Sequence, residues 1–355
     1  MHDIYYLDHA ATSYPIKYFA KDYYISGNPN SSHALGLQAN QTLNEARQRI
    51  MNCLGVKSGK VLFCRCASEA VEWLCNTIEH RQLPSYLIRY CSPHEHDSVA
   101  LCCCEYNNEL LKRKQLYLHQ YVNHITGTVF NIESIGKQVQ STGAFFGSDF
   151  TAAVGHCPSP KNLDSFCDAV WFSGHKFSCE PGIGAIWVSD KLFKYLGGSE
   201  GNRNNYGLIH GTPNVSAAVA MSYAMKHAID GLEDGNDEHW RSLLEYLEIK
   251  LLGNRIDCNI VAKSQPKTCA INALYLPNIN GDALVQYLSS KSIYISPGHS
   301  ACSNDVAEAS RVLEAFGLTK KQASQTVRVS FGEPTSQEDI DALVKGIVEF
   351  KEMFV

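Results

Sequence analysis

The sequence lacks any apolar run that approaches the length of a bilayer span. It also lacks a strong excess of charge, because its 355 residues carry a formal net charge of −5 and the pI is near 6.3. Such a balance gives no general attraction to nucleic acid or to an anionic membrane surface. The N-terminus shows no basic segment followed by an apolar one, as a secretory signal would. We therefore expect a cytoplasmic protein with no nucleic-acid and no membrane partner.

Metal-ligand spacing is missing as well, although the sequence contains 14 cysteines. Cys64 and Cys66 are separated by one residue, and Cys102 to Cys104 are consecutive, so neither group has the C-x-x-C spacing that suits tetrahedral zinc. The other cysteines are scattered, without the paired spacing of a small disulfide scaffold. We expect no metal site and reduced cysteines, most of them buried as small hydrophobic residues.

The sequence does contain a regular alternation of strands and helices. It is 45% hydrophobic and 19% charged, which is typical of a globular protein. Apolar runs predict strands at residues 4–7, 61–63, 86–90, 116–122, 144–148, 169–172 and 184–188. Strands that alternate with helices predict an α/β fold, with a mostly parallel sheet covered on both faces. An acidic, Gly-containing stretch at residues 231–235 predicts a boundary between two lobes.

One predicted strand ends in a lysine-bearing turn. The apolar residues 169–172 lead into Ser173-Gly174-His175, and Lys176 follows directly. A lysine at this place suits a pocket in which its amine is desolvated and acts as a Schiff-base nucleophile. Taken alone, the motif favours the simpler interpretation of a strand followed by a solvated surface lysine.

Polar residues also follow several other predicted strands. They are Ser68, His96, His124, Asp149 and Lys176. In α/β sheets, ligands bind beyond the strand ends. A lysine, an aspartate one strand away, a flat histidine ring and a turn before a helix start together fit pyridoxal phosphate, because the turn offers N–H groups to a phosphate.

At this point the sequence resembles the cysteine desulfurases of the NifS/IscS type, which are class V aminotransferases of pyridoxal-phosphate fold type I. The resemblance covers nearly the whole chain. Its motifs, in shared order, are Tyr6–Thr12, Asn28–His33, Ala67–Glu69, Glu95-His96, Ser173–Lys176, Gly211–Asn214, Gly298–Cys302 and Val327–Gly332.

The resemblance implies two domains. The large pyridoxal-phosphate-binding domain, residues 13–233, would contain a mainly parallel seven-stranded sheet covered by helices. A smaller α+β domain, residues 1–12 and 234–355, would carry the catalytic cysteine loop.

The resemblance also implies the cofactor contacts. Lys176 would hold pyridoxal 5′-phosphate and move the Cα proton, Asp149 would pair the pyridinium nitrogen, and His96 would stack on the ring. The phosphate would be held by Ala67, Ser68, Ser173 and His175. Thr212 would reach the phosphate of the neighbouring subunit, which implies a homodimer.

The substrate implied is L-cysteine. Arg328 would bind its carboxylate as a bidentate fork, beside Asn123 and His124. Cys302, in a Gly- and Ser-rich loop, would attack its sulfur, leaving alanine and a persulfide. The persulfide would pass to a sulfur-acceptor protein, a scaffold or sulfur carrier of the kind used in iron–sulfur cluster assembly.

The sequence departs from the family at three polar contacts. His124 replaces an asparagine near the substrate carboxylate, Ala152 replaces a glutamine on the cofactor's phenolic oxygen, and Ile209 replaces an arginine. We hypothesise that His124 donates toward the phenolic oxygen or the carboxylate; the other interpretation is that it caps a strand end. The departures leave two further functions open: a related class V enzyme of altered substrate, such as a selenocysteine lyase, or a cofactor-binding scaffold subunit without turnover.

Overall fold

The computed structural model describes residues 4–13, 17–81, 88–103, 115–200, 205–298 and 306–354. These residues fall into two compact units. The larger unit comprises Pro15–Tyr121 and Asn131–Asp230, and the smaller unit comprises Met1–Tyr14, Val122–Phe130 and Gly231–Val355. The short segment Val122–Phe130 thus groups with the smaller unit, although it lies inside the sequence range expected for the large domain.

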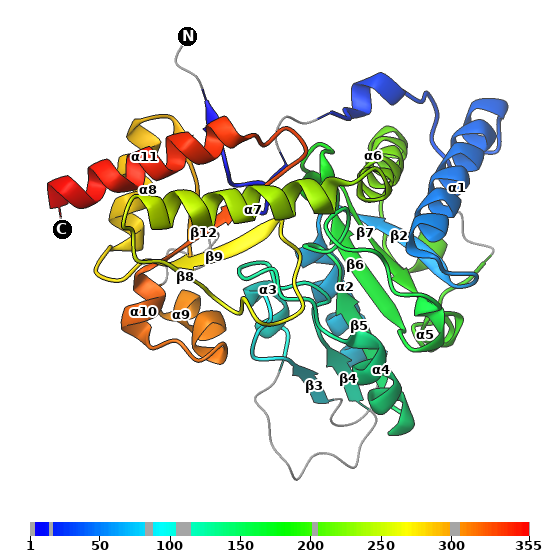
Figure 1. The fold of residues 1–355 in the computed structure, drawn as a ribbon. Helices are drawn as coiled ribbons and strands as arrows, with labels where there is room; N and C mark the ends of the chain where they lie inside the picture. Colours follow the sequence, from blue (N-terminus) through cyan, green and yellow to red (C-terminus); the bar gives the residue numbers. More distant parts are fainter. Residues whose placement is uncertain are drawn as a thin grey trace. The chain divides into compact units, whose positions relative to one another are not determined.

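A six-stranded sheet forms the centre of the larger unit (Figure 1). Its strand order is β2 (Lys60–Cys64), β7 (Gly184–Val188), β6 (Ala169–Ser173), β5 (Phe145–Asp149), β4 (Gln115–Leu118) and β3 (Ile88–Cys91). Strands β3 to β6 pair in parallel, whereas β7 is antiparallel to both of its neighbours. The prediction of an α/β fold is confirmed, but the sheet is mixed, with three parallel and two antiparallel strand pairs.

The expectation of seven strands is wrong for the described part of the chain, in which this sheet has six. The number seven came from the family resemblance and not from this sequence. In the range of the larger unit, the sequence itself offers six apolar runs of strand length, and each of them forms a strand of the sheet.

Helices cover both faces of this sheet. Alternate residues of several strands, including Leu62, Trp171 and Ile186, pack in one core cluster with α2 (Ala67–Arg81). On the other face, Gly136 of α4 (Ile132–Ser141) lies so close to Phe146 that a Cβ would be 2.9 Å from its ring. Strands β5, β6 and β7 are buried at every position, so both faces of the sheet must be covered by helices. The unit also contains α1 (Ala34–Leu54), α3 (Asp97–Ala100), α5 (Asp190–Tyr195), most of α6 (Val215–Glu233), and the 3₁₀ helices η1 (Ala20–Tyr23), η3 (Leu163–Ser165), η4 (Gly174–Phe177) and η5 (Asn205–Gly207).

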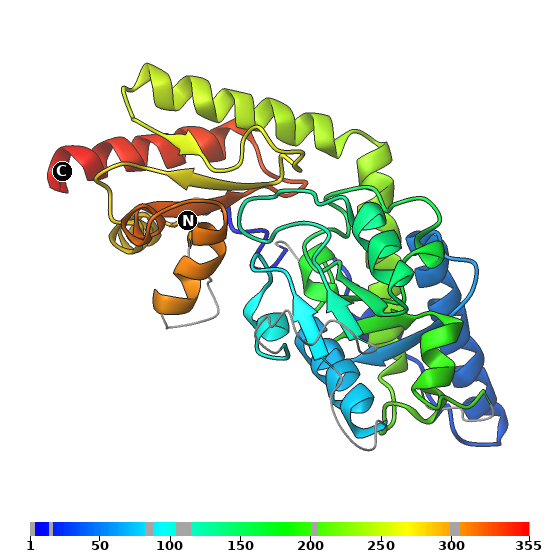
Figure 2. The same ribbon diagram turned by 90° about the horizontal axis from the view of Figure 1, so that it is seen from below.

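The smaller unit is α+β. Its four-stranded sheet has the order β11 (Ser296–Pro297), β12 (Thr326–Ser330), β9 (Ile271–Tyr275) and β8 (Asn259–Ile260), and all its pairs are antiparallel. A parallel pair joins β1 (Tyr5–Tyr6) to β10 (Ile293–Tyr294). Helices α7 (Asn236–Gly253) and α11 (Gln337–Phe354) run side by side along one face of the sheet, and α9 (Val306–Ala315) and α10 (Lys320–Ser324) lie on the other (Figures 1 and 2). Helix α8 (Gly281–Ser290) packs on α11.

Within the described ranges, the structure contains no helix with the length and apolar character needed to span a membrane.

Candidate functional site

The larger unit places Asp149 and the lysine-bearing turn at the same edge of its sheet. Asp149 is the last residue of β5 and is in register with Trp171 of the parallel strand β6. Two residues later β6 ends at Ser173, and Lys176 follows in η4. Parallel neighbours end at one edge, so the strand topology alone brings these two residues to one region. Gly174 permits the turn, because a Cβ there would lie 3.1 Å from Cys179 Cβ.

Asp149 is a buried carboxylate, with 7% of its surface exposed. Its Oδ1 accepts a hydrogen bond from the backbone N–H of Thr151 at 2.7 Å. Burial raises the pKa of Asp149, while the Thr151 groups and the nearby His96 act in the opposite direction. An ionised carboxylate in such a place is costly unless it meets a positive partner. A protonated pyridine nitrogen is a partner of this kind, so Asp149 fits the proposed cofactor.

The ring of His96 is held in a fixed orientation at the start of α3. Its Nδ1 accepts a hydrogen bond from the Ser98 N–H at 3.2 Å and lies 3.0 Å from Ser98 Oγ. In the neutral ring the proton is therefore assigned to Nε2. The side chain is half-buried, and it interacts electrostatically with Asp149. Such a ring can stack on a flat ligand whose nitrogen lies at Asp149.

Backbone N–H groups at the start of α2 lie next to the end of β6. The Ala67 N–H donates to Ser173 Oγ at 2.7 Å, which leaves the Ser173 hydroxyl proton available to a further acceptor. No described residue accepts from the backbone N–H of Ser68 or Glu69. Ser68 itself is exposed. Unpaired N–H groups at a helix start attract anions, so this arrangement suits a phosphate.

Two histidines next to Lys176 are neutral at physiological pH. Burial, and then the charge of Lys176, lower the pKa of His175 to about 4. His156 is buried, and its pKa is also lowered to about 4, by burial and by Lys176, against the effect of a hydrogen bond to the Ala152 backbone. His175 can therefore serve a phosphate as a neutral hydrogen-bonding group and not as a cation.

His156 was not among the residues singled out from the sequence. It follows Asp149 in the same connection between β5 and β6, and that position was the signal that could have identified it. The His156 side chain is hydrogen-bonded to the backbone of Ala152, the position where the family has a glutamine.

The smaller unit brings Arg328 and His124 together. Arg328, in β12, is 4% exposed. Its Nη2 donates to Asp8 Oδ1 at 2.8 Å and to Ser296 Oγ at 3.0 Å, and its Nη1 donates to the backbone carbonyl of His124 at 3.2 Å. Its Nε is buried and has no hydrogen-bond partner among the described residues. Asp8, the counter-ion of Arg328, was not predicted as a site residue from the sequence, although it belongs to the first family motif.

The side chain of Asn123 stabilises a turn in this unit. Its side-chain oxygen accepts from the backbone N–H groups of Ile125 and Thr126, at 3.0 and 2.8 Å, and from the Thr126 hydroxyl at 3.1 Å. These bonds close the turn that carries His124. The side-chain oxygen of Asn123 is therefore used inside the protein, and the predicted role in substrate binding stays a prediction.

Two predicted site residues lie apart from these clusters or outside the described part. Thr212 is exposed, in the connection before α6. Cys302 lies outside the described residues.

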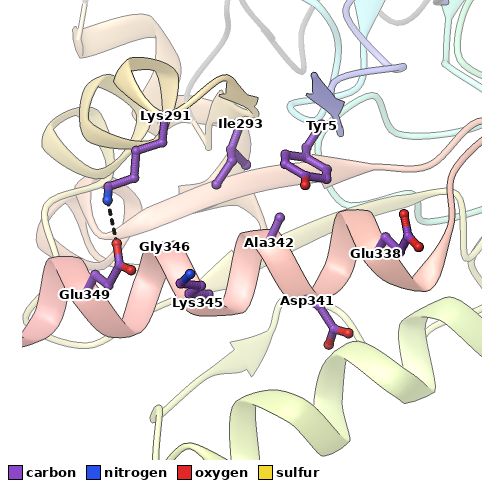
Figure 3. Close-up of a pocket in the computed structure, with 9 residues that line it drawn as sticks. All are labelled: Tyr5, Lys291, Ile293, Glu338, Asp341, Ala342, Lys345, Gly346 and Glu349. Atoms are coloured by element: carbon purple, nitrogen blue, oxygen red, sulfur yellow. Dashed lines mark hydrogen bonds and ion pairs between the residues drawn. The ribbon is translucent and has the colours of Figure 1, made fainter. Parts of the chain in front are cut away.

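The smaller unit also contains a pocket of about 500 Å³ beside β1 and α11 (Figure 3). None of the predicted site residues line it. Its lining residues are Tyr5, Lys291, Ile293, Glu338, Asp341, Ala342, Lys345, Gly346 and Glu349.

Comparison with known proteins gives one consistent result. The sequence model of the family described as aminotransferase class-V matches residues 5–110 and 86–343. A cysteine desulfurase of Trichormus azollae is 30% identical over 362 residues, which cover 94% of this chain and 88% of that protein. The IscS-like cysteine desulfurase of Mycobacterium tuberculosis is 28% identical and covers 96% and 94%. The solved NifS-like protein of Rickettsia africae has a TM-score of 0.82 at 22% identity, covers 99% of this chain and 100% of that chain, and supports the fold.

Proposed function

The chain belongs to the aminotransferase class-V family, and we propose that it is a pyridoxal-phosphate-dependent cysteine desulfurase. It would convert L-cysteine to L-alanine and form a persulfide on Cys302 for a sulfur acceptor. The observation that carries the proposal is the placement of Asp149 and Lys176 at the ends of the parallel strands β5 and β6. The names of its relatives support it.

The larger unit would hold the cofactor. When bound, pyridoxal phosphate supplies an electron sink for negative charge at the substrate Cα. Lys176 would hold it through Nζ and then move the Cα proton. Asp149 would keep the ring nitrogen protonated, and His96 would cover the ring face with its imidazole. The neutral state of His156 and His175 fits this task, because further cations there would raise the cost of the Lys176 ammonium.

The phosphate would occupy the region between β6 and the start of α2. Ser173 would donate its hydroxyl proton, while the Ala67 N–H holds the Ser173 hydroxyl in place and the Ser68 N–H would face the phosphate. His175 would add a neutral hydrogen bond. The N-terminal end of the α2 dipole favours the negative charge of the phosphate there.

Arg328 would bind the substrate carboxylate, with its buried Nε as the donor that the described residues leave unused. Asp8 already neutralises part of the guanidinium charge, so the substrate would share the group with an internal carboxylate. His124 is adjacent through its backbone carbonyl. We propose that its ring replaces the family's amide toward the substrate carboxylate or the cofactor's phenolic oxygen.

Sulfur transfer would take place at Cys302. Its thiolate sulfur would attack the sulfur of the substrate, so that an S–S bond forms and the substrate's Cβ–S bond breaks. The electron pair of that bond, with a proton, would complete alanine. The persulfide would then pass to a sulfur-acceptor protein in the cytoplasm, such as one that assembles iron–sulfur clusters.

We propose that the enzyme is a homodimer whose sites are shared through Thr212, which is exposed before α6. Co-expression of K176A and T212V chains tests this idea. A mixed dimer would contain one site with both residues intact, so activity absent from each homodimer should return in the mixture. If the mixed dimer stays inactive, Thr212 does not act across subunits.

The direct test is a reaction of the purified protein, supplied with pyridoxal phosphate, with L-cysteine. Alanine should form, and the cofactor absorbance should change on addition of substrate. K176A should lose covalently held cofactor, whereas C302A should keep it but form no persulfide. Cys53, half-buried on α1, provides a control, and C53A should behave as the unchanged protein.

The departures at His124 and Ala152, together with the internal use of Asn123 Oδ1, favour one alternative, a related enzyme of altered substrate. Alanine released from selenocysteine but not from cysteine would establish it. Bound cofactor without turnover of either amino acid would indicate a scaffold subunit and would contradict the proposal.

A further inference from the structure

The segment Val122–Phe130 forms a turn that belongs by its contacts to the smaller unit. The chain enters it after β4 and leaves it toward α4, and both of these elements belong to the larger unit. Between residues 121 and 128, every residue is buried except His124, which is half-buried. The turn therefore exposes one side chain, at the position where the family has an asparagine.

The hydroxyl of Thr126 is the centre of the hydrogen bonds that hold this turn. It donates to Asn123 Oδ1 at 3.1 Å and accepts from the Thr128 N–H at 3.3 Å. It also lies 2.8 Å from Thr128 Oγ1, and because its own proton points to Asn123, the Thr128 hydroxyl is the donor. A hydroxyl offers one proton and two lone pairs, so these bonds use all that Thr126 has. Thr126 has no exposed surface.

Both neighbours of His124 are fixed in the interior. Asn123 accepts hydrogen bonds from the backbone of the turn, as described above, and has no exposed surface. Ile125 is 1% exposed and belongs to a core cluster with Ala273 and Leu313. A buried polar network whose members are paired is rigid. The backbone of His124 is therefore held between a hydrogen-bonded residue and a core residue.

The same turn is docked on the sheet that carries Arg328. The Thr268 N–H donates to the Gly127 carbonyl at 2.9 Å. Gly127 has a φ of 74°, and a Cβ there would lie 2.3 Å from the Ile271 carbonyl oxygen, so the turn contacts the start of β9 with its backbone. Strand β9 pairs with β12, and Arg328 of β12 donates to the His124 carbonyl at 3.2 Å. The turn and the guanidinium thus form one assembly within one unit.

We propose that Thr126 is a positioning residue that fixes His124 beside Arg328, so that the two side chains bind the substrate carboxylate together. This inference rests on the function proposed above, and it chooses between the two partners considered for His124. The turn belongs to the same unit as Arg328, whereas Asp149 and Lys176 belong to the other unit. His124 therefore serves the carboxylate that Arg328 binds and not the phenolic oxygen of the cofactor.

The experiment compares T126V with T126S in protein supplied with pyridoxal phosphate. Valine has nearly the same shape but makes none of the three hydroxyl hydrogen bonds, whereas serine can make them all. L-Alanine carries the same carboxylate without sulfur, and the cofactor absorbance reports its binding. T126V should weaken alanine binding about tenfold, which is the size of one hydrogen bond to a charged group, and T126S should restore it.

Two further measurements separate positioning from general damage. The affinity for the cofactor should be the same in T126V as in the unchanged protein, and with L-cysteine KM should rise about tenfold at a nearly constant kcat. T42V is the matched control, because Thr42 is an exposed threonine on α1 that donates to the Gln38 carbonyl at 3.0 Å. It should leave every one of these values unchanged.

Hydrogen–deuterium exchange of residues 122–130 tests the rigidity of the turn without any ligand. Exchange should be slow in the unchanged protein and faster in T126V, while β6 should exchange equally in both. If T126V fails to fold, H124A should show the same tenfold loss of alanine binding at constant cofactor affinity.

The role of Thr126 is overturned by fast exchange of the turn in the unchanged protein. It is also overturned if the unchanged protein does not bind alanine, if T126V or H124A binds it normally, if T126S fails to restore binding, or if T126V loses affinity for the cofactor. Alanine binding without release of sulfur from cysteine would contradict the desulfurase function and leave the positioning role standing.

Discussion

The buried ion pair between Asp8 and Arg328 gives a quantitative test of the smaller unit. The side chains are 17% and 5% exposed, and the Nη2–Oδ1 distance is 2.8 Å. D8N keeps the shape and an acceptor oxygen but removes the negative charge. Removing one partner of a buried pair costs about 3–5 kcal/mol, because the other charge stays buried. Since the amide oxygen can still accept from Arg328, we expect the lower end, about 3 kcal/mol.

Thermal unfolding followed by circular dichroism measures this loss. A unit of this size changes its unfolding midpoint by about 2–4 °C per kcal/mol, so D8N should lower Tm by about 6–12 °C. The effect should persist at high salt, because buried pairs are screened weakly. The double variant D8N/R328M should recover part of the loss, since it leaves no unpaired charge.

The chain supplies a matched control in the same unit. Arg241 Nη2 and Asp237 Oδ2 are also 2.8 Å apart, but their side chains are 59% and 41% exposed. D237N should therefore leave the midpoint unchanged. If D8N and D237N behave alike, or if high salt removes the effect of D8N, the argument from burial is wrong.

Two further predictions concern the larger unit. His156 and His175 have pKa values lowered to about 4, below their value in the unfolded chain, so the unfolded state binds more protons between pH 6.5 and 4. As the pH is lowered from 6.5 to 4, the free energy of unfolding should decrease by up to about 1.4 kcal/mol per pH unit for each histidine. H156F should therefore flatten a profile of Tm against pH, and an unchanged profile would contradict the assigned burial. S173A removes the acceptor of the Ala67 N–H and should cost about 1–3 kcal/mol in urea unfolding and weaken cofactor binding in a fluorescence titration. S68A, at an exposed position, should leave stability unchanged, and equal losses for both variants would refute this reading of the turn.

Much of the fold follows from patterns that are local in sequence. The apolar run 184–188 forms β7 with the predicted bounds, and 169–172 forms β6 with one added residue. Such runs are recognisable because a strand buried on both faces must be apolar throughout. The direction of β7, which is antiparallel to both neighbours, could not be predicted from the sequence, because an apolar run is compatible with either strand direction.

The candidate site divides in the same manner. The sequence by itself determined that Lys176 follows a buried strand and that Asp149 ends another, because strand ends are set by where apolar residues stop. Only the tertiary structure decided which groups surround them. It placed His156 close enough to Lys176 for their charges to interact, and it gave Arg328 the counter-ion Asp8. These pairings join residues far apart in sequence, and the physical reason is that burial and charge depend on three-dimensional packing, which no local pattern encodes.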